Sequence, residues 1–189
     1  MPEPATARLR AATAADAAAI AHVHQESWRT TYSGILPRDV IEHLAGRRSQ
    51  ENWRARLAGG REMETTWIAQ DDDGRVIGFA NAGPARHRLE GLEAEIYALY
   101  VLQDAQRRGV GRSLVAECAR HFVRHGRFGF YLWVLKANRA RMFYEALGGT
   151  EVAEKSERLG LHSFSEIAYA WHDLSVLVGG EPARLPGVG

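Results

Sequence analysis

The spacing of the apolar residues changes in the middle of the chain, and this change is what most constrains the fold. In the first sixty residues they recur at helical intervals, as from Ala17 through Ile20 and His24 to Trp28. From Trp67 onward, short apolar runs separated by turn residues predict strands, and helical spacing returns only in later segments. A chain that mixes the two periods predicts an α/β fold, with one central sheet and helices on both of its faces.

The individual elements follow from local signals. We expect a strand over residues 7–12, then a helix that begins at the N-cap Thr13, with Asp16 completing a capping box, and ends near Trp28. Pro37 and Ser49 are expected to open two further helices. The rest is a hairpin of strands 67–69 and 76–80, strands over 93–102, 128–135, 150–158 and 163–174, and helices over 109–125 and 138–147. Together they predict one domain over residues 7–175, with flexible tails over 1–6 and 178–189.

Composition excludes several classes of protein. Apolar residues make up 46% of the chain and charged residues 25%, which is typical of a globular protein, and the net charge of +1 favours neither nucleic acid nor a membrane as partner. Cys118 is the single cysteine, which excludes an intramolecular disulfide and a cysteine-based zinc site. The longest nearly unbroken apolar run, Phe128 to Leu135, is too short to span a membrane, and no secretory signal is visible. We therefore expect a cytoplasmic protein.

The segment from Glu95 to Arg112 carries the strongest functional signal. A predicted strand leads through a short loop into a helix whose first turn contains Gly109 and Gly111. The free N–H groups at a helix start bind anions, and glycines let a bulky anion approach the main chain. Arg107, Arg108 and Arg112 add positive charge at the same point. The segment therefore predicts a phosphate or pyrophosphate site, although a tight turn without a ligand would give the same glycines.

Two familiar phosphate sites do not fit this segment. There is no Gly-Lys-Ser/Thr of a nucleoside triphosphate loop, and neither the third glycine nor the acidic residue of a dinucleotide site is present. The expected cofactor thus carries a pyrophosphate but is neither ATP nor NAD.

Two blocks of the sequence resemble the GNAT superfamily of acetyl-CoA-dependent N-acetyltransferases. The first is Gln106-Arg107-Arg108-Gly109-Val110-Gly111, which fits the Gln/Arg-x-x-Gly-x-Gly/Ala signature of that superfamily. The second runs from Asn138 to Tyr144-Glu145-Ala146-Leu147-Gly148, in the expected order after the first. The resemblance spans about residues 9–174. It departs from the usual pattern in the spacing of Asn138 from Tyr144 and in Gln103, which stands where a proline is common.

The resemblance implies a single domain with a mostly antiparallel, splayed sheet of about seven strands, and acetyl-CoA as co-substrate with no metal. The pantetheine arm would lie along the backbone of Leu99, Tyr100 and Val101, where the sheet splays. Asn138 would contact the cofactor near its thiol, and it is also expected to be the N-cap of its helix. The pyrophosphate would be held by the loop and first helical turn that follow the strand: Gln106, Arg107, Arg108, Gly109, Val110, Gly111 and Arg112.

Two residues are expected to act in catalysis. Tyr144 matches the family's general acid, which protonates the departing thiolate, and the alternative is an aromatic core residue beside Phe143. Glu95 matches an acid that serves some relatives as general base, and the alternative is a structural acid paired with an arginine, or an anchor for a cationic substrate. The backbone N–H of Val101 would polarise the thioester carbonyl. Cys118 is expected in the core, which favours direct transfer in a ternary complex over an acetyl-enzyme.

The acceptor site is expected between the first two helices and the predicted hairpin. Trp28 and Tyr32 either wall this pocket or pack the helix on the sheet, and strand alternation places Glu93 and Tyr97 on the face of Glu95, together with Leu99. His121 and His125 lack a third metal ligand and are expected on an exposed face.

The acceptor would be an amine of a small molecule or of a protein. Three alternatives remain open: another acyl-CoA, a hydroxyl acceptor, or a non-catalytic acyl-CoA sensor, against which the presence of Tyr144 and Glu95 argues. A homodimer is also compatible with the apolar final strands.

Overall fold

A computed structural model describes residues 7–46, 50–159 and 162–179. Its centre is one seven-stranded sheet with the strand order β1-β2-β3-β4-β5-β7-β6. Every neighbouring pair is antiparallel except β4 and β5, which are parallel. The strands are β1 (Arg8–Ala11), β2 (Thr65–Gln70), β3 (Val76–Leu89), β4 (Leu92–Val101), β5 (Phe130–Leu135), β6 (Thr150–Leu159) and β7 (His162–Trp171). The predicted fold class, a mostly antiparallel sheet within a mixed α/β domain, is confirmed.

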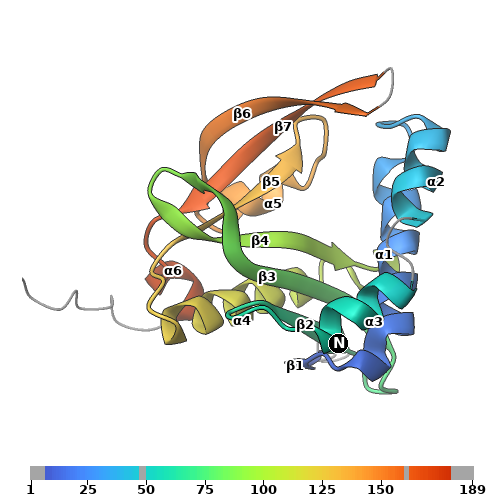
Figure 1. Cartoon of the computed structure of the whole chain (residues 1–189), viewed down its shortest axis with the longest axis horizontal. Helices are drawn as coiled ribbons and strands as arrows, with labels where there is room; N and C mark the ends of the chain where they lie inside the picture. Colours follow the sequence, from blue (N-terminus) through green and yellow to red (C-terminus); the bar gives the residue numbers. More distant parts are fainter. Residues whose placement is uncertain (1–6, 47–49, 160–161, 180–189) are drawn as a thin grey trace, which may run out of the picture.

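Helices cover both faces of this sheet, as Figure 1 shows. On one face lie α1 (Ala17–Tyr32), α2 (Arg38–Gly46) and α3 (Gln50–Ala58), and on the other α4 (Val110–Arg124), α5 (Arg141–Ala146) and α6 (Ser175–Val178). The apolar faces of α1 and α3 pack on Ile68 and Phe79, while α4 packs on Ile96, Phe130 and Leu132. The sheet is thus buried on both sides where the two helical layers meet it.

Several element boundaries differ from those expected. The helix α1 continues to Tyr32 rather than ending near Trp28, and β3 runs to Leu89 rather than to residue 80. Asn138 is not the N-cap of α5, which begins at Arg141; its Oδ1 instead accepts a hydrogen bond from the N–H of Ala140 at 2.9 Å, in the turn before the helix. The predicted cap Ser49 and most of both predicted tails lie outside the described residues.

The capping box at the start of the first helical segment is confirmed. The carboxylate of Asp16 accepts hydrogen bonds from the backbone N–H and the hydroxyl of Thr13, at 2.8 and 3.1 Å. Arg10 binds both oxygens of the same carboxylate, and this pairing lowers the pKa of Asp16 to about 2. The capped segment starts as a short 3₁₀ turn and continues directly into α1.

The sheet splays open between β4 and β5, as expected. These two strands are joined at a single register position, where Glu95 lies opposite Tyr131. Beyond it, β4 continues to Val101 along β3, and β5 continues to Leu135 along β7. The facing edges of β4 and β5 diverge from this point, so their backbone N–H and C=O groups are available to an extended ligand.

A β-bulge in β4 changes which side chains share a face. One residue step on β3, from Asn81 to Ala82, lies opposite two steps on β4, from Ala98 to Ile96, so Tyr97 is the extra residue. Ile96 therefore packs towards α4, whereas Ala98 packs towards α1 and α3. The expectation that Leu99 shares a face with Glu95 is wrong, because the bulge reverses the alternation and turns Leu99 towards the α4 side.

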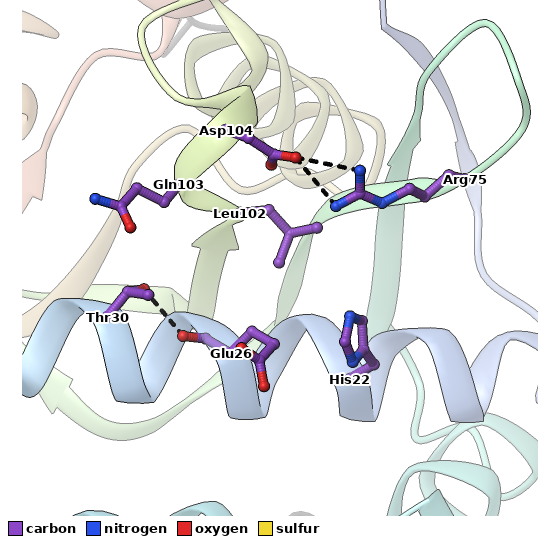
Figure 2. A pocket seen from close by; sticks show the side chains of 7 residues that line it. All are labelled: His22, Glu26, Thr30, Arg75, Leu102, Gln103 and Asp104. Carbon is purple, nitrogen blue, oxygen red and sulfur yellow. Dashed lines mark hydrogen bonds and ion pairs between the residues drawn. The ribbon is translucent and has the colours of Figure 1, made fainter.

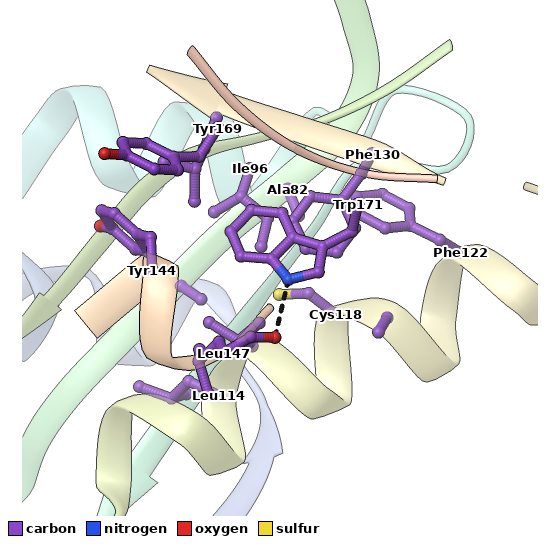
Figure 3. Close-up of a cluster of buried hydrophobic side chains, with 14 of the residues drawn as sticks. Ala82, Ile96, Leu114, Cys118, Phe122, Phe130, Tyr144, Leu147, Tyr169 and Trp171 are labelled. Carbon is purple, nitrogen blue, oxygen red and sulfur yellow. Dashed lines mark hydrogen bonds between the residues drawn. The ribbon is translucent and has the colours of Figure 1, made fainter. Parts of the chain in front are cut away.

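The core on the α4 side includes the predicted core cysteine (Figure 3). Cys118 is fully buried beside Leu114 and Phe122, and its burial raises the pKa of the thiol well above the usual range. Trp171 stacks on Phe130 with ring centroids 4.8 Å apart and donates its indole N–H to the carbonyl of Leu147 at 3.0 Å. This bond links β7 to the end of α5 and fixes the helix that carries Tyr144.

Candidate active site

The predicted anion site lies at the start of α4. Gly109 is the N-cap and adopts a left-handed conformation with φ of 83°, which glycine adopts without steric cost. The N–H of Ser113 bonds to the carbonyl of Gly109 at 3.0 Å, so the N–H groups of Val110, Gly111 and Arg112 precede the first helical bond. The side chains of Arg107, Arg108 and Arg112 are exposed around this turn. The helix dipole and these three cations all favour a bound anion.

The loop before α4 is held in its turn by its own contacts. Arg107 also has a positive φ, of 60°, so two left-handed residues within three positions reverse the chain. The side chain of Gln106 donates to the carbonyl of Val101 at 3.0 Å and ties the loop to the end of β4. Gln106 therefore has a structural role in this loop in addition to the cofactor role expected of it.

Gly111 faces α5 closely. A Cβ atom at this position would lie 3.2 Å from the ring of Phe143, so glycine allows the start of α4 and α5 to approach one another. Tyr144 follows Phe143 and is buried, with 7% of its surface exposed. The second sequence block is thereby brought beside the first, although the two are far apart in the chain.

Burial sets the chemistry of Tyr144. Its desolvation raises the pKa of the phenol well above 10, and the nearby phenol of Tyr100 raises it further. Its ring lies against Tyr169 and Trp171, as Figure 3 shows, and also against Phe143. The phenol is therefore protonated throughout the neutral range, which is the state that a proton donor requires.

Trp28 and Tyr32 of α1 contact Tyr100 of β4, the strand along which the pantetheine arm is expected to lie. The indole N–H of Trp28 donates to the hydroxyl of Tyr100 at 2.9 Å, and the rings of Trp28 and Tyr32 lie 4.6 Å apart. Tyr32 is buried, and its burial together with a hydrogen bond to Tyr100 raises the pKa of its phenol. These aromatic residues pack α1 on β4, in one cluster with Tyr100 of β4 and Leu135 of β5.

Glu95 lies at the closed end of the gap, in a contact that favours the structural alternative. Its side chain is 1% exposed and forms an ion pair with the guanidinium of Arg86. It also accepts hydrogen bonds from the backbone N–H of Arg86 at 3.0 Å and from the hydroxyl of Tyr131 at 3.2 Å. A carboxylate that accepts all of these hydrogen bonds is engaged in holding Arg86, which is the structural role.

The two other residues expected near the acceptor lie beside this ion pair. Glu93 is paired with Arg88 and with Arg127, the latter at 2.6 Å. The hydroxyl of Tyr97 donates to the carbonyl of Pro84, and the guanidinium of Arg86 lies 5.3 Å from the Tyr97 ring centroid. Glu93 therefore makes surface ion pairs, whereas Tyr97 supports Arg86.

Arg86 and Tyr131 are the site residues that sequence reasoning missed. Arg86 lies in the part of β3 that was not expected, beyond residue 80. The turn Glu90–Gly91, with φ of 53° and 76°, joins β3 to β4 as a two-residue hairpin and carries Arg86 back over Glu95. A Glu-Gly pair between two apolar runs was the signal that could have revealed this hairpin.

Two open hollows border the site. The larger, of about 500 Å³, lies between α1 and the loop after β4, and its wall includes the ion pair of Arg75 with Asp104 (Figure 2). The smaller, of about 300 Å³, lies at the start of α5 and includes Asn138 together with Lys136, Arg139 and Arg141. Of the predicted site residues, only Asn138 lines either hollow.

The described part of the chain contains neither a cluster of metal ligands nor a helix that could span a membrane. Within it, no three His, Cys, Asp or Glu residues come together as metal ligands. His121 Nε2 lies 3.0 Å from the carbonyl of Met63, and His125 Nδ1 lies 2.9 Å from the carbonyl of His121. No helix in the described segments is both long and apolar enough to cross a bilayer.

Comparison with known sequences identifies relatives over most of the chain. The model of the acetyltransferase (GNAT) family matches residues 20–148, which include both sequence blocks. The uncharacterized N-acetyltransferase YuaI of Bacillus subtilis is 37% identical over 169 residues, covering 89% of this chain and 95% of that protein.

Solved structures share the fold. The PaiA N-acetyltransferase of Thermoplasma acidophilum, in complex with coenzyme A, has a TM-score of 0.67 at 21% identity, over 86% of this chain and 98% of that one. YncA of Salmonella typhimurium, a putative acetyltransferase with its cofactor acetyl-CoA, has a TM-score of 0.67 at 19% identity, over 97% of this chain and 99% of that one.

Proposed function

Since the chain belongs to the acetyltransferase (GNAT) family, we propose that it transfers the acetyl group of acetyl-CoA to a primary amine within a ternary complex. The observation that carries this proposal is the gap between β4 and β5 that ends at the glycine-containing start of α4. Such a gap suits an extended arm with a pyrophosphate at one end, and the fold is shared with proteins solved with coenzyme A or acetyl-CoA.

In this proposal the cofactor lies along β4 like an added strand. Leu99, Tyr100 and Val101 offer backbone groups to the pantetheine arm, because β4 has no β5 partner beyond Glu95. The N–H groups from Gly109 to Arg112 hold the pyrophosphate, aided by the exposed arginines of the same turn. Asn138 lies 8% exposed before α5 and is proposed to contact the thiol end of the cofactor.

The chemistry is a direct acyl transfer. The neutral amine attacks the thioester carbonyl and a C–N bond forms. As the C–S bond breaks, the proton that the amine loses passes to solvent water, which afterwards restores the proton of Tyr144. A backbone N–H of β4, proposed to be that of Val101, stabilises the oxyanion. Tyr144 gives its proton to the departing sulfur, and its raised pKa keeps that proton in place until a thiolate forms.

A covalent acetyl-enzyme is not part of this proposal. The lone cysteine is fully buried in the core between α4 and the sheet, and burial raises the pKa of its thiol. A thiol in that state is a poor nucleophile, because the reactive form is the thiolate. This supports the proposal that both substrates are bound at once.

The test is calorimetric titration of the purified protein with acetyl-CoA, ATP and NAD in parallel. We expect acetyl-CoA alone to bind, with a Kd on the order of micromolar. Addition of a panel of primary amines should then release free coenzyme A, measured by its thiol. Binding of ATP or NAD in place of acetyl-CoA, or binding of acetyl-CoA with no release of thiol by any amine, would contradict the proposal.

A further inference from the structure

The ion pair of Glu95 with Arg86 places a fixed cation at the closed end of the gap. Glu95 receives donors from the backbone N–H of Arg86, from its guanidinium through Nε and Nη2, and from Tyr131. Tyr131, itself 1% exposed, also donates to the carbonyl of His87 at 2.7 Å. Three donor groups, the backbone N–H and the guanidinium of Arg86 and the hydroxyl of the buried Tyr131, thus engage the carboxylate of Glu95, which orients Arg86.

Arg86 is held on two sides but stays accessible. One edge of its guanidinium faces Glu95, and one face lies over the Tyr97 ring at 5.3 Å. Its side chain is nevertheless 55% exposed. Among the described residues Nη1 has no hydrogen-bond partner, so its two N–H groups point to a ligand or to solvent. A guanidinium whose orientation is already fixed loses little entropy on binding an anion.

The irregular backbone between Pro84 and Leu89 positions Arg86. Between Pro84 and Leu89, five residue steps on β3 lie opposite only two on β4, from Ala94 to Leu92. The three extra residues fold over the start of β4 and bring Arg86 back onto Glu95.

Arg86 lies too far from the start of α4 to bind the phosphates of the proposed cofactor. Glu95 and Tyr131 form the pair at which β4 and β5 begin to diverge, whereas the predicted pyrophosphate site follows the far end of β4, after Val101. At about 3.3 Å per residue, the two ends of this strand segment lie roughly 20 Å apart. Arg86 also packs with Tyr97 and Tyr131, on the face opposite α4. Arg86 is therefore available to a second substrate at the end of the gap opposite the predicted pyrophosphate site.

From this geometry we infer that the amine acceptor also carries a carboxylate, which the free edge of Arg86 binds. The acceptor class is then a small amino acid, and Glu95 acts as the positioning residue for Arg86. Guanidinium groups bind carboxylates through paired, coplanar hydrogen bonds, so the charge and the direction of the acceptor would both be selected. This inference rests on the proposed acetyl transfer and names its substrate class.

The experiment compares matched acceptors. Free amino acids, their carboxamides and the corresponding decarboxylated amines are each assayed for acetylation at a fixed saturating concentration of acetyl-CoA. We expect kcat/KM to be roughly 10- to 100-fold higher for the amino acids, which is the factor that loss of a charged hydrogen bond produces. Equal or better activity on the amides and amines would overturn the inference.

Variants assign the preference to Arg86. Arg86→Lys keeps the charge but loses the planar fork, and the double variant Arg86→Gln/Glu95→Gln removes both charges without leaving one buried and unpaired. Both should raise KM for amino acids by about the same factor and reduce the preference over the amides. Arg88→Gln, on the same strand with a 76% exposed side chain, is the matched control and should keep the preference. A preference that survives in the double variant would contradict the role of Arg86.

Glu95→Gln separates positioning from base catalysis. A positioning residue predicts a raised KM for amino acids with a smaller change in kcat, whereas loss of a base would lower kcat for every acceptor and change its pH profile. Titration with acetyl-CoA tests the proposed function independently of the acceptor preference. If acetyl-CoA binds and amines are acetylated without regard to a carboxylate, only the inference fails; if acetyl-CoA does not bind, the proposed function fails and the inference falls with it.

Discussion

Tyr144 is the residue on which the proposed chemistry depends most. Replacement by phenylalanine keeps the ring contacts with Tyr169 and Trp171 but removes the only proton that this side chain can give to a thiolate. We expect kcat to fall about 100-fold, within the range for a lost general acid, with little change in the affinity for acetyl-CoA. Steady-state kinetics and calorimetry measure the two quantities.

The pH profile adds a second check on Tyr144. Because burial raises its pKa above 10, the acid form persists, and kcat should not decline through deprotonation of this phenol below pH 10. Tyr169→Phe is the control for loss of a neighbouring phenol, since that hydroxyl is bound to Glu145 and Arg141. A Tyr144→Phe enzyme with full turnover would remove the acid role.

For Cys118 we expect a substitution to lower stability and not activity. Cys118→Ala should leave kcat and KM nearly unchanged, because a buried thiol with a raised pKa takes no part in a direct transfer. The cavity left in the core should lower the free energy of unfolding by about 1–2 kcal/mol. Chemical denaturation and the acetylation assay measure these effects. Complete loss of activity in a folded variant would point back to an acetyl-enzyme.

At the level of single residues, the sequence predicted where a residue lies in the fold better than which side chains it contacts. Tyr144, Cys118 and Asp16 were assigned from motif or spacing, and the structure adds burial and contacts to each. Glu95 was left among three roles, because its partner Arg86 lies in a stretch of β3 that carries no regular alternation. The contact of Arg86 with Glu95 depends on the irregular pairing of β3 with β4, which the sequence of either strand alone does not reveal.

Among the elements, the start of α4 is the most specific to function. Gly109→Val forces a β-branched residue into a left-handed conformation, which costs on the order of 1–2 kcal/mol, although no atom lies within 4 Å of its Cβ. We expect the protein to stay folded and its affinity for acetyl-CoA to fall by at least about tenfold, because the side chain and the altered backbone obstruct the N–H groups. Calorimetry gives the affinity and circular dichroism the fold.

The same helix supplies the matched control. Gly126, after the end of α4, also has a positive φ, of 71°, with no atom within 4 Å of its Cβ. Gly126→Val should therefore cost similar stability and leave acetyl-CoA binding intact. If both variants bind acetyl-CoA as the unaltered protein does, the pyrophosphate site is elsewhere.

The elements also show where local signals mislead. The apolar periods located all seven strands, but the bulge at Tyr97 and the long hairpin of β3 and β4 could not be read from alternation. Asn138 was expected to cap α5 because asparagine is a common N-cap, yet it stabilises the preceding turn, and the helix starts three residues later. The four-residue α6 was not expected, since so short an element has no period, although Leu177 and Val178 pack on the core.

For the molecule as a whole, the proposed cofactor would connect the two parts of the sheet. One part is β1 to β4 and the other is β5 to β7, with Glu95 opposite Tyr131 as the register position between them. Saturation at about 100 times Kd should raise the free energy of unfolding by about 2.7 kcal/mol. Amide hydrogen exchange should slow from Leu99 to Val101 and in the first turn of α4.

In the hydrogen-exchange experiment, amides far from the gap serve as an internal reference. Amides in β2 are bonded within the sheet, between β1 and β3 and away from the gap, and their exchange should change only as much as global stability does. Equal protection of β2, β4 and the start of α4 would show that acetyl-CoA stabilises the fold without lying along β4.

The gap in the sheet has a consequence for solubility. Unpaired strand edges are where β proteins associate with one another, and most sheets have two of them. A sheet that opens between β4 and β5 has four: the outer edges of β1 and β6, and the two edges that border the gap. An extended ligand in the gap would cover the inner pair, so the protein without such a ligand should be more prone to self-association.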